Sequence, residues 1–281
     1  MAETGKLYVV ATPIGNLEDI TLRAIRILKE VTLIAAEDTR RTRILLQHYN
    51  IKTPLTSLYE QNESTKSPAL VARIKAGQSI ACVTDAGTPG ISDPGYRFVQ
   101  LAIAEGINVV AIPGVSALIT ALCVSGLPMD HFVFQGFLPD GKGKKKAALQ
   151  SLRDDHRTQI FYESPNRLIA TLKAIREILG NRFVVVAREL TKVYEEVVRG
   201  DVEEVLWSFA EKKVRGEITL IVAGNNAVEK IKDHEEEIKK RFDLLSLEGV
   251  LSNRDIVDRI ASELDLPRKC VYDAVHRRRG L

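Results

Sequence analysis

The stretch from Ile80 to Glu105 constrains the fold of this chain more than any other. The apolar run Ile80–Val83 opens into the loop Asp85–Gly95, eleven residues with two carboxylates, three glycines and two prolines, and a helix-like pattern follows from Tyr96. Glycine permits positive φ and close approach of a ligand, whereas proline fixes φ and removes a donor. A plain strand-to-helix turn needs only about two to six residues. Ligand sites of open α/β sheets lie at the carboxyl ends of strands, so we expect a binding loop, with an ordinary turn as the alternative.

Apolar runs and helix-like stretches alternate through the first half of the chain. This alternation predicts a mostly parallel sheet with helices on both faces. We expect strands near 7–11, 32–36, 55–58, 80–83 and 108–112, and helices near 21–29, 39–48, 68–76, 96–105 and 114–125.

The tripeptide Gly126-Leu127-Pro128 interrupts that rhythm, and we place a domain boundary there. The expected domains are an N-terminal α/β domain (1–127), a second α/β domain (128–228) and a small helical domain (229–281). The second domain shows strands near 132–135, 159–162, 183–187 and 218–223, a hairpin around 195–200, and helices near 144–152, 166–179 and 202–211. In the charged tail, Ser252 and Asp255 form a capping-box-like start, and another helix begins near Pro267.

Bulk composition is that of an ordinary globular protein. The 281 residues are 45% hydrophobic and 27% charged, with a formal net charge of +3, so a basic surface must come from local clustering. The cysteines Cys82, Cys123 and Cys270 lie far apart, which favours buried thiols over disulfides or a zinc site. Residues 1–30 lack a signal-peptide pattern, and no apolar run approaches the roughly 18 residues of a membrane span. We expect a soluble cytoplasmic protein without a bound metal.

Two further Pro/Gly loops follow expected strands. They are 11–17, Ala-Thr-Pro-Ile-Gly-Asn-Leu, and 112–117, Ile-Pro-Gly-Val-Ser-Ala. The first lacks the Gly-x-Gly-x-x-Gly fingerprint of dinucleotide sites, and Ser116 in the second could cap a helix or contact a ligand. Together with the loop Asp85–Gly95 they would line one crevice.

Basic residues cluster in two places. If a helix begins at Thr39, Arg40 and Arg43 share a face and could grip phosphates, although a solvated helix start is an equal alternative. The segment 136–143 nearly spells a phosphate-binding P-loop, but Gly143 stands where Ser or Thr is required. A flexible basic loop for a polyanionic substrate explains it better, with Lys142, Lys144, Lys145 and Lys146 as contacts.

Acidic residues pair with basic or hydroxyl ones at two strand ends of the second domain, in 161–167 and 188–192. Structural salt bridges are the alternative to a site there. The chain ends on a basic stretch from 267 that could contact a nucleic-acid backbone or simply be solvated. His-Glu-x-x-His, Cys-x-x-Cys, Gly-x-Ser-x-Gly and a complete Walker A motif are absent from the sequence.

As a set, these motifs resemble the ribosomal-RNA-modifying branch of the tetrapyrrole methylase family. The resemblance runs from about Leu7 to Ala223, and Asn166 departs from it because that group usually shows histidine there. The motifs that carry it are 11–17 (Ala-Thr-Pro-Ile-Gly-Asn-Leu), 36–40 (Ala-Glu-Asp-Thr-Arg), 85–90 (Asp-Ala-Gly-Thr-Pro-Gly), 160–165 (Ile-Phe-Tyr-Glu-Ser-Pro) and 188–192 (Arg-Glu-Leu-Thr-Lys).

The resemblance implies two α/β domains with S-adenosylmethionine in the cleft between them, usually in a homodimer. It implies methyl transfer to the 2′-hydroxyl of a cytidine in 16S ribosomal RNA of the small subunit. The cofactor-binding residues it implies are Pro13, Asp85, Ala86, Gly87, Pro89, Ser116, Ala117, Tyr162, Ile218 and Thr219.

Because the methyl group of a sulfonium is already activated, alignment supplies much of the rate, and a base would help. The candidate catalytic residues are Asp85, Asp38, Glu163 and Glu189, together with Lys192, which could bias their ionisation or activate the hydroxyl. Two alternatives stay open: a methyltransferase acting on a tetrapyrrole or another small molecule, and a non-catalytic RNA- or nucleotide-binding protein.

Overall fold

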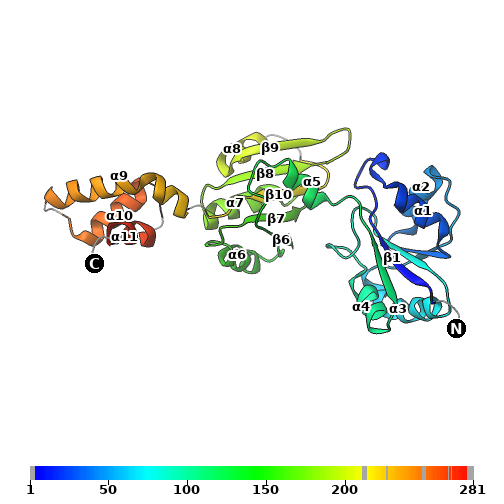
Figure 1. Ribbon diagram of the computed structural model, residues 1–281. Helices are drawn as coiled ribbons and strands as arrows, with labels where there is room; N and C mark the ends of the chain where they lie inside the picture. Colours follow the sequence, from blue (N-terminus) through cyan, green and yellow to red (C-terminus); the bar gives the residue numbers. More distant parts are fainter. Residues whose placement is uncertain are drawn as a thin grey trace.

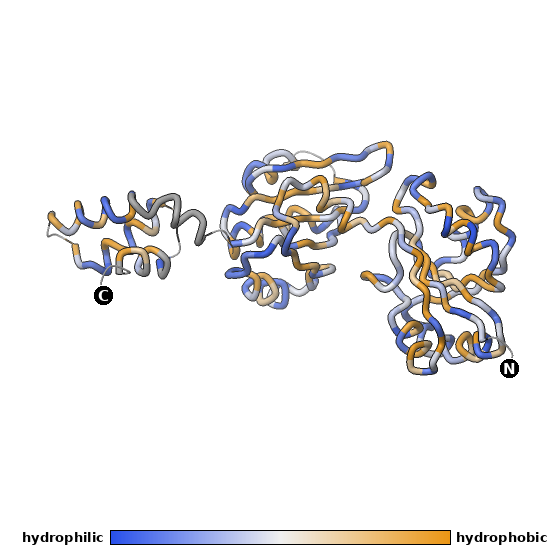
Figure 2. Tube along the Cα trace, viewed as in Figure 1, coloured by the Kyte–Doolittle hydropathy of each residue, from blue (hydrophilic) through white to orange (hydrophobic). Residues whose placement is uncertain are grey.

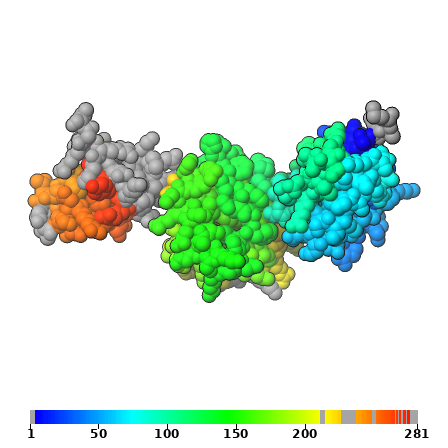
Figure 3. All heavy atoms as spheres, turned by 90° about the horizontal axis from the view of Figure 1, so that it is seen from below, coloured from blue at the N-terminus to red at the C-terminus, as the bar shows by residue number. Residues whose placement is uncertain are grey.

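The computed structural model describes residues 4–210, 214–225, 227–248, 251–264, 266 and 268–276. Three parts follow one another along the chain: two α/β units and a group of helices (Figure 1). In the space-filling view they form successive lobes in the order of the sequence colours (Figure 3). This architecture confirms the predicted fold class.

The first sheet is parallel throughout, as the alternation predicts. Its strand order is β3-β2-β4-β1-β5. Because β4, β1 and β5 are neighbours, the loops that follow them emerge side by side at one edge. The strands are β1 (Lys6–Val10), β2 (Leu33–Ala36), β3 (Leu55–Ser57), β4 (Ile80–Val83) and β5 (Asn108–Ile112).

Helices cover both faces of this sheet (Figure 1). One face buries Leu28 of α1 and Leu46 of α2 against Ile34, and the other buries Ile74 of α3 and Phe98 of α4. Apolar strands run through the middle of each α/β unit (Figure 2). The helices are α1 (Leu22–Glu30), α2 (Thr39–His48), α3 (Glu60–Lys75) and α4 (Tyr96–Ala104), with a 3₁₀ turn, η1, at Leu17–Asp19.

Helix α3 corrects the prediction that a helix begins near Pro68. It begins at Glu60, where Tyr59 donates its backbone N–H to the Asn62 side chain, and Pro68 lies inside it. The buried carboxylate of Glu63, in the first turn, accepts the backbone N–H groups of Gly95 and Phe98 at 3.0 Å each. The first turn of α3 therefore fixes the end of the long loop and the start of α4.

The second sheet is mixed, with order β6-β7-β10-β8-β9, and β6–β7 is its parallel pair. Strands β8 and β9 pair antiparallel, so the two strands form a hairpin, but its turn precedes the predicted position, and residues 196–200 lie in the single strand β9. Helices α6, α7 and α8 bury one face of the sheet through residues such as Leu149, Leu172 and Val205. The elements are β6 (Phe132–Phe137), α6 (Lys142–Ser151), β7 (Thr158–Glu163), α7 (Leu168–Leu179), β8 (Phe183–Arg188), β9 (Glu196–Asp201), α8 (Val202–Phe209) and β10 (Ile218–Val222).

Helix α5 (Ala117–Cys123) packs on the second sheet, although it precedes the expected boundary in sequence. Its buried residue Leu122 shares a core with Ile160 and Ile221, on the face opposite α7. The chain thus contributes a helix to the second sheet before entering it. The division at 127/128 and 228/229 remains our proposal.

The C-terminal helices have a core of their own, which includes Ile238, Ile256 and Val271. Ser252 accepts the N–H of Asp255, which confirms the predicted cap of α10. The expected helix start at Pro267 and the basic residues 277–279 lie outside the described residues. The helices are α9 (Ala227–Glu248), α10 (Asn253–Glu263) and α11 (Arg268–His276). Among the helices of the described residues, none is long and apolar enough to cross a bilayer.

The cysteine prediction is half right. Cys82 is buried in β4, and burial raises the pKa of its thiol to about 12. Cys123 is exposed, because it lies at the end of α5 away from the buried side formed by Leu118 and Leu122. The side chain of Cys270 lies outside the described residues.

Candidate active site

A cavity of about 310 Å³ lies between the two sheets. Loops that follow β1, β4 and β5 supply one wall, through Ile14, through Ala86–Thr88 with Ile91–Asp93, and through Ser116–Ala117. The three Pro/Gly loops therefore meet at one cavity, because their strands are neighbours in the first sheet.

Backbone hydrogen bonds hold these loops together. Thr12 and Gly87 exchange N–H···O bonds of 2.8 and 3.0 Å, and the Thr88 hydroxyl donates to the carbonyl of Val115 at 3.1 Å. The loop after β4 is thus hydrogen-bonded to the loop after β1 and to the loop after β5. These bonds hold the three loops together as one wall of the cavity.

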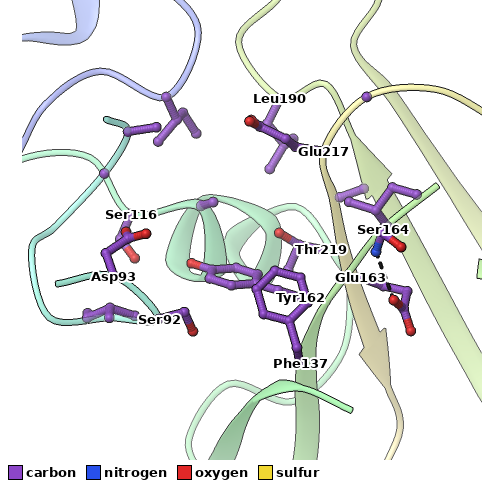
Figure 4. Close-up of a pocket in the computed structure, with 18 of the residues that line it drawn as sticks. Ser92, Asp93, Ser116, Phe137, Tyr162, Glu163, Ser164, Leu190, Glu217 and Thr219 are labelled. Carbon is purple, nitrogen blue, oxygen red and sulfur yellow. Dashed lines mark hydrogen bonds between the residues drawn. The ribbon is translucent and has the colours of Figure 1, made fainter. Parts of the chain in front are cut away.

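The second sheet supplies the opposite wall. Figure 4 shows Tyr162 and Phe137 across the cavity from Ser92 and Asp93. Burial raises the pKa of the Tyr162 hydroxyl. The remaining wall residues are Glu163, Ser164, Pro165, Ala187, Leu190, Gly216, Glu217, Ile218 and Thr219.

The turn after β8 joins the two α/β units. Glu189 and Thr191 have φ of 51° and 67°, a conformation that is strained for residues other than glycine. Lys192 packs on Gly15 of the first unit, where a Cβ would lie 2.4 Å from the Lys192 Cγ. Lys192 Nζ also lies 2.8 Å from Glu189 and 3.1 Å from Glu217. Burial lowers the pKa of Lys192, but these two hydrogen bonds outweigh it and raise the pKa, and the bond to Lys192 lowers that of Glu189.

Asp85 and Asp38 lie outside the cavity wall and hold neighbouring loops together. Asp85 Oδ1 accepts the backbone N–H of Asp38 at 2.9 Å, and its Oδ2 is 3.5 Å from Arg41. Burial raises the pKa of Asp85. Asp38 caps α2 by accepting the N–H of Arg40 at 2.8 Å, and its hydrogen bond with the Arg40 side chain lowers its pKa to about 2.

Glu163 is part of the wall, but its carboxylate is fully engaged in a buried network. Its side chain is 1% exposed and accepts the Thr171 hydroxyl at 2.6 Å and the Ser164 N–H at 2.8 Å. Arg167 Nε lies 3.2 Å from the same carboxylate, and Arg167 also donates to the carbonyl of Leu138. This network fixes the turn at Ser164, whose hydrogen bond to Glu163 is drawn in Figure 4.

Asp93 is a wall residue that the sequence analysis did not single out. It is half-buried, and burial, together with the charge of Glu37, raises its pKa to about 6. Asp93 is the second carboxylate of the loop Asp85–Gly95, and its place in that loop could have identified it as a site residue from the sequence. Glu217, which was not predicted from the sequence either, contributes another carboxylate to the wall.

Of the residues expected to bind the cofactor, seven line the cavity and three lie just outside its wall. Pro13 and Pro89 are buried beside the wall residues Ile14 and Thr88, and Asp85 bonds to Asp38. Asn166 is exposed and stands outside the wall. The seven are Ala86, Gly87, Ser116, Ala117, Tyr162, Ile218 and Thr219.

The lysine segment is helical, so the predicted flexible loop is wrong. Lys142–Lys146 form the first turns of α6, since Lys, Ala, Leu and Gln favour helix and Leu149 anchors the segment in the core. Lys145 donates to Thr171 Oγ1 at 3.1 Å, which extends the Glu163 network. Of the basic residues predicted to contact RNA, Lys142, Lys144 and Lys146 on α6 and Arg40 and Arg43 on α2 are exposed.

Comparison with known proteins identifies the family. Residues 6–206 match the profile of the Tetrapyrrole (Corrin/Porphyrin) Methylases. The ribosomal RNA small subunit methyltransferase I of Halalkalibacterium halodurans is 45% identical over 98% of this chain and 96% of its own length. Its namesake from Thermotoga maritima is 50% identical over 78% of this chain and 99% of its own length. The chain belongs to the ribosomal RNA small subunit methyltransferase I family of tetrapyrrole methylases. It is a methyltransferase, and its cofactor is S-adenosylmethionine.

Solved structures share the fold. Uroporphyrin-III C-methyl transferase from Thermus thermophilus, complexed with S-adenyl homocysteine, superposes with a TM-score of 0.55 at 20% identity. It covers 78% of this chain and 97% of its own. Diphthine synthase has a TM-score of 0.61 at 15% identity and covers 78% of this chain and 90% of its own.

The cavity wall fits this cofactor. The volume of the cavity, about 310 Å³, lies in the range of roughly 300–1,000 Å³ typical of small-molecule sites. Apolar side chains such as Ile14, Ile91 and Leu190 suit an adenine ring, and the carboxylates of Asp93 and Glu217 suit cationic groups. When bound, S-adenosylmethionine supplies a methyl group that needs no further activation.

Proposed function

We propose that the protein methylates the ribose 2′-hydroxyl of a cytidine in 16S ribosomal RNA. The observation that carries the proposal is a cofactor-sized cavity between two α/β units in a chain that also exposes basic side chains on α2 and α6. Basic side chains on two separate helices suit the regularly spaced phosphates of a nucleic acid. The names of relatives at 44–50% identity support RNA as the substrate.

We further propose that Asp93 accepts the proton of the acceptor hydroxyl. It lines the cavity, is half-buried, and has a pKa near 6, so it is ionised at neutral pH yet remains a usable base. The carboxylates of Asp38, Glu163 and Glu189 are each hydrogen-bonded to a basic side chain or a hydroxyl. Asp85 is engaged by a backbone N–H and by Arg41. Because their carboxylates are held by these contacts, we assign Asp38, Asp85, Glu163 and Glu189 to positioning the loops of the site and not to proton transfer.

Phosphates of the RNA would meet the basic residues beside the cavity. Arg40 and Arg43 on α2, and the exposed lysines Lys142, Lys144 and Lys146 on α6, act as point charges or forks for phosphate oxygens. Lys145 contributes indirectly, because its hydrogen bond to Thr171 holds it against α7.

Assembly and location belong to the same proposal. The β8–β9 turn exposes Val193 (93%) and Tyr194 (75%), apolar side chains that a homodimer would cover. A small-ribosomal-subunit substrate places the protein in the cytoplasm.

Methyl transfer from labelled S-adenosylmethionine to purified 30S particles tests the proposal. Digestion of the product should yield 2′-O-methylcytidine. Label that enters a tetrapyrrole in place of 30S particles would overturn the RNA assignment. Calorimetry addresses the non-catalytic alternative, since tight ATP binding without S-adenosylmethionine binding would contradict an enzyme of this class.

A further inference from the structure

Phe137 is a large apolar side chain that stands exposed at the cavity. It lines the cavity and is nevertheless 53% exposed. Its ring lies 5.8 Å from that of Tyr162, centroid to centroid, at an interplanar angle of 59° (Figure 4). A solvated aromatic ring beside a binding site offers a π-face to a flat ligand.

A β-bulge turns Phe137 toward the cavity. Successive side chains of a strand point to opposite faces, so Phe134 and Phe137 would lie on opposite faces of a regular β6. The register shifts between them: Phe134 pairs with Ile160, and Phe137 pairs with Tyr162, so three steps on β6 match two on β7. Both phenylalanines therefore contact Tyr162. Bulges beside active sites commonly re-aim a side chain in this way.

Gly136 is the residue that makes the bulge possible. Its φ is 65°, which L side chains rarely adopt, and a Cβ there would lie 3.5 Å from the Ser92 hydroxyl of the first unit. The bulge thus brings Phe137 next to the loop that carries Asp93.

The segment after Phe137 is clamped, so the ring is preorganised. Leu138 is buried, and its carbonyl accepts a hydrogen bond from Arg167, whose Nη1 also lies 2.7 Å from Asp140. Two residues beyond Asp140, α6 begins with the exposed lysines Lys142, Lys144 and Lys146. An aromatic face followed closely by positive charge is the combination by which proteins bind single-stranded nucleic acid.

We propose that Phe137 is a stacking platform for one unstacked nucleobase of the RNA, the base of the nucleotide whose ribose enters the cavity. This inference rests on the proposed function and deepens it. Proteins that recognise particular RNA nucleotides mostly target single-stranded segments, whose unstacked bases stack on aromatic side chains. Stacking on Phe137 would hold the ribose beside Asp93 while the α6 lysines hold the backbone. Because every base has a π-face, Phe137 fixes position and leaves base identity to other groups.

A short single-stranded RNA with one pyrrolo-cytidine and an end label tests the platform in the presence of S-adenosylhomocysteine. Stacking quenches pyrrolo-cytidine, and anisotropy of the end label reports binding. We expect quenching with the wild type, loss of quenching with Phe137→Ala, and an affinity weaker by about 5- to 150-fold. Phe137→Trp should restore both. Phe132→Ala is the matched control, since Phe132 lies on the same strand, is 37% exposed, and is outside the cavity wall.

Three results would overturn the inference. They are unchanged quenching in Phe137→Ala, an equal loss of S-adenosylhomocysteine affinity by calorimetry, or a change of oligomeric state in light scattering. The second would assign Phe137 to the cofactor and the third to a contact between copies of the chain. Methylation of 30S particles by the wild type is measured separately, so failure of the proposed function is distinguishable from failure of the platform.

Discussion

At the scale of single residues, the cavity contains carboxylates with different surroundings. Glu163 is surrounded by donors and is 1% exposed, whereas Asp93 has a raised pKa because it is partly desolvated next to other acids. Paired carboxylates hold a fold together, and a carboxylate with a raised pKa is suited to proton transfer. Two variants separate these roles.

We expect Asp93→Asn to lower kcat by about 10²- to 10⁴-fold while leaving S-adenosylhomocysteine affinity nearly unchanged. In the wild type, kcat/KM should fall as the pH drops through about 6, because Asp93 becomes protonated there. The variant should lack this acid limb, and Asp85→Asn should keep it. A pH–rate profile on 30S particles decides; an acid limb that persists in Asp93→Asn would contradict the assignment.

The raised pKa of Asp93 also predicts how the stability of the folded protein changes with pH. A raised carboxyl pKa means that the folded state binds the proton more tightly than the unfolded state, so stability falls between about pH 4 and pH 6 as the proton is lost. Asp93→Asn should therefore be no less stable than the wild type at pH 7.5. Thermal unfolding at pH 7.5 and pH 4 measures this, and a variant destabilised at the higher pH would show that Asp93 carries structural contacts.

Glu163→Ala should lower the free energy of unfolding by about 3–5 kcal/mol, because the Thr171 hydroxyl and the Ser164 N–H lose their acceptor and Arg167 loses one of its two carboxylate partners. The matched control is Arg176→Ala, which breaks the exposed pair with Glu203 and should cost less than about 1 kcal/mol. Urea unfolding measures both. Equal effects of the two substitutions would contradict the buried-network interpretation.

At the scale of elements, the strands are placed so that loops from both α/β units meet. The loops after β4, β1 and β5 form one wall, and the bulge in β6 with the turn after β8 completes the other. The basic side chains lie at the starts of α2, which follows β2, and of α6, which follows β6 and its bulge.

Charge reversal at α6 should separate RNA binding from cofactor binding. Lys142→Glu with Lys144→Glu should weaken binding to 30S particles at low salt and flatten its salt dependence, since fewer counterions are released. The start of α6 tolerates acids because they favour a helix N-terminus. The control is Lys29→Glu with Lys52→Glu, two exposed residues that precede β2 and β3 at the opposite edge of the first sheet. Filter binding and calorimetry check both affinities; loss of cofactor affinity with the α6 variant would contradict separate surfaces.

At the scale of the whole molecule, the C-terminal helices have a hydrophobic core separate from those of the two sheets. Their core is built from α9, α10 and α11. The Thermotoga maritima relative matches over 220 residues that make up 99% of its length. The two sheets, from Lys6 to Val222, span a segment of that size.

A chain ending at residue 225 should therefore fold and bind S-adenosylhomocysteine with the affinity of the full chain. Its melting temperature should match the main transition of the full chain, because the cores around the two sheets are untouched. Calorimetry and thermal unfolding measure this. A truncated chain that is unfolded, or that does not bind S-adenosylhomocysteine, would show that the C-terminal helices support the cavity.

Most of the elements could be predicted from the chain itself. The strand Ile80–Val83, the strand Asn108–Ile112 and the helix Thr39–His48 agree with the structure at both ends, because apolar runs, caps and turn residues act locally. The start of α3 could not be predicted from the sequence. Pro68 usually marks a helix boundary, and the hydrogen bond between Glu63 and Gly95, which fixes the first turn of α3, joins residues 32 apart in the chain. Most of the cofactor residues that the family resemblance implies line the cavity.

Local pattern alone thus determined the alternating strands and helices, the Pro/Gly loops at strand ends and the basic clusters of this protein. Tertiary structure decided what those elements do together. It placed α5 on the second sheet, engaged Glu163 with Arg167, and raised the pKa of Asp93 by desolvation. The physical reason is range: propensity and periodicity act over a few residues, whereas burial, ion pairing and strand register depend on which distant segments meet.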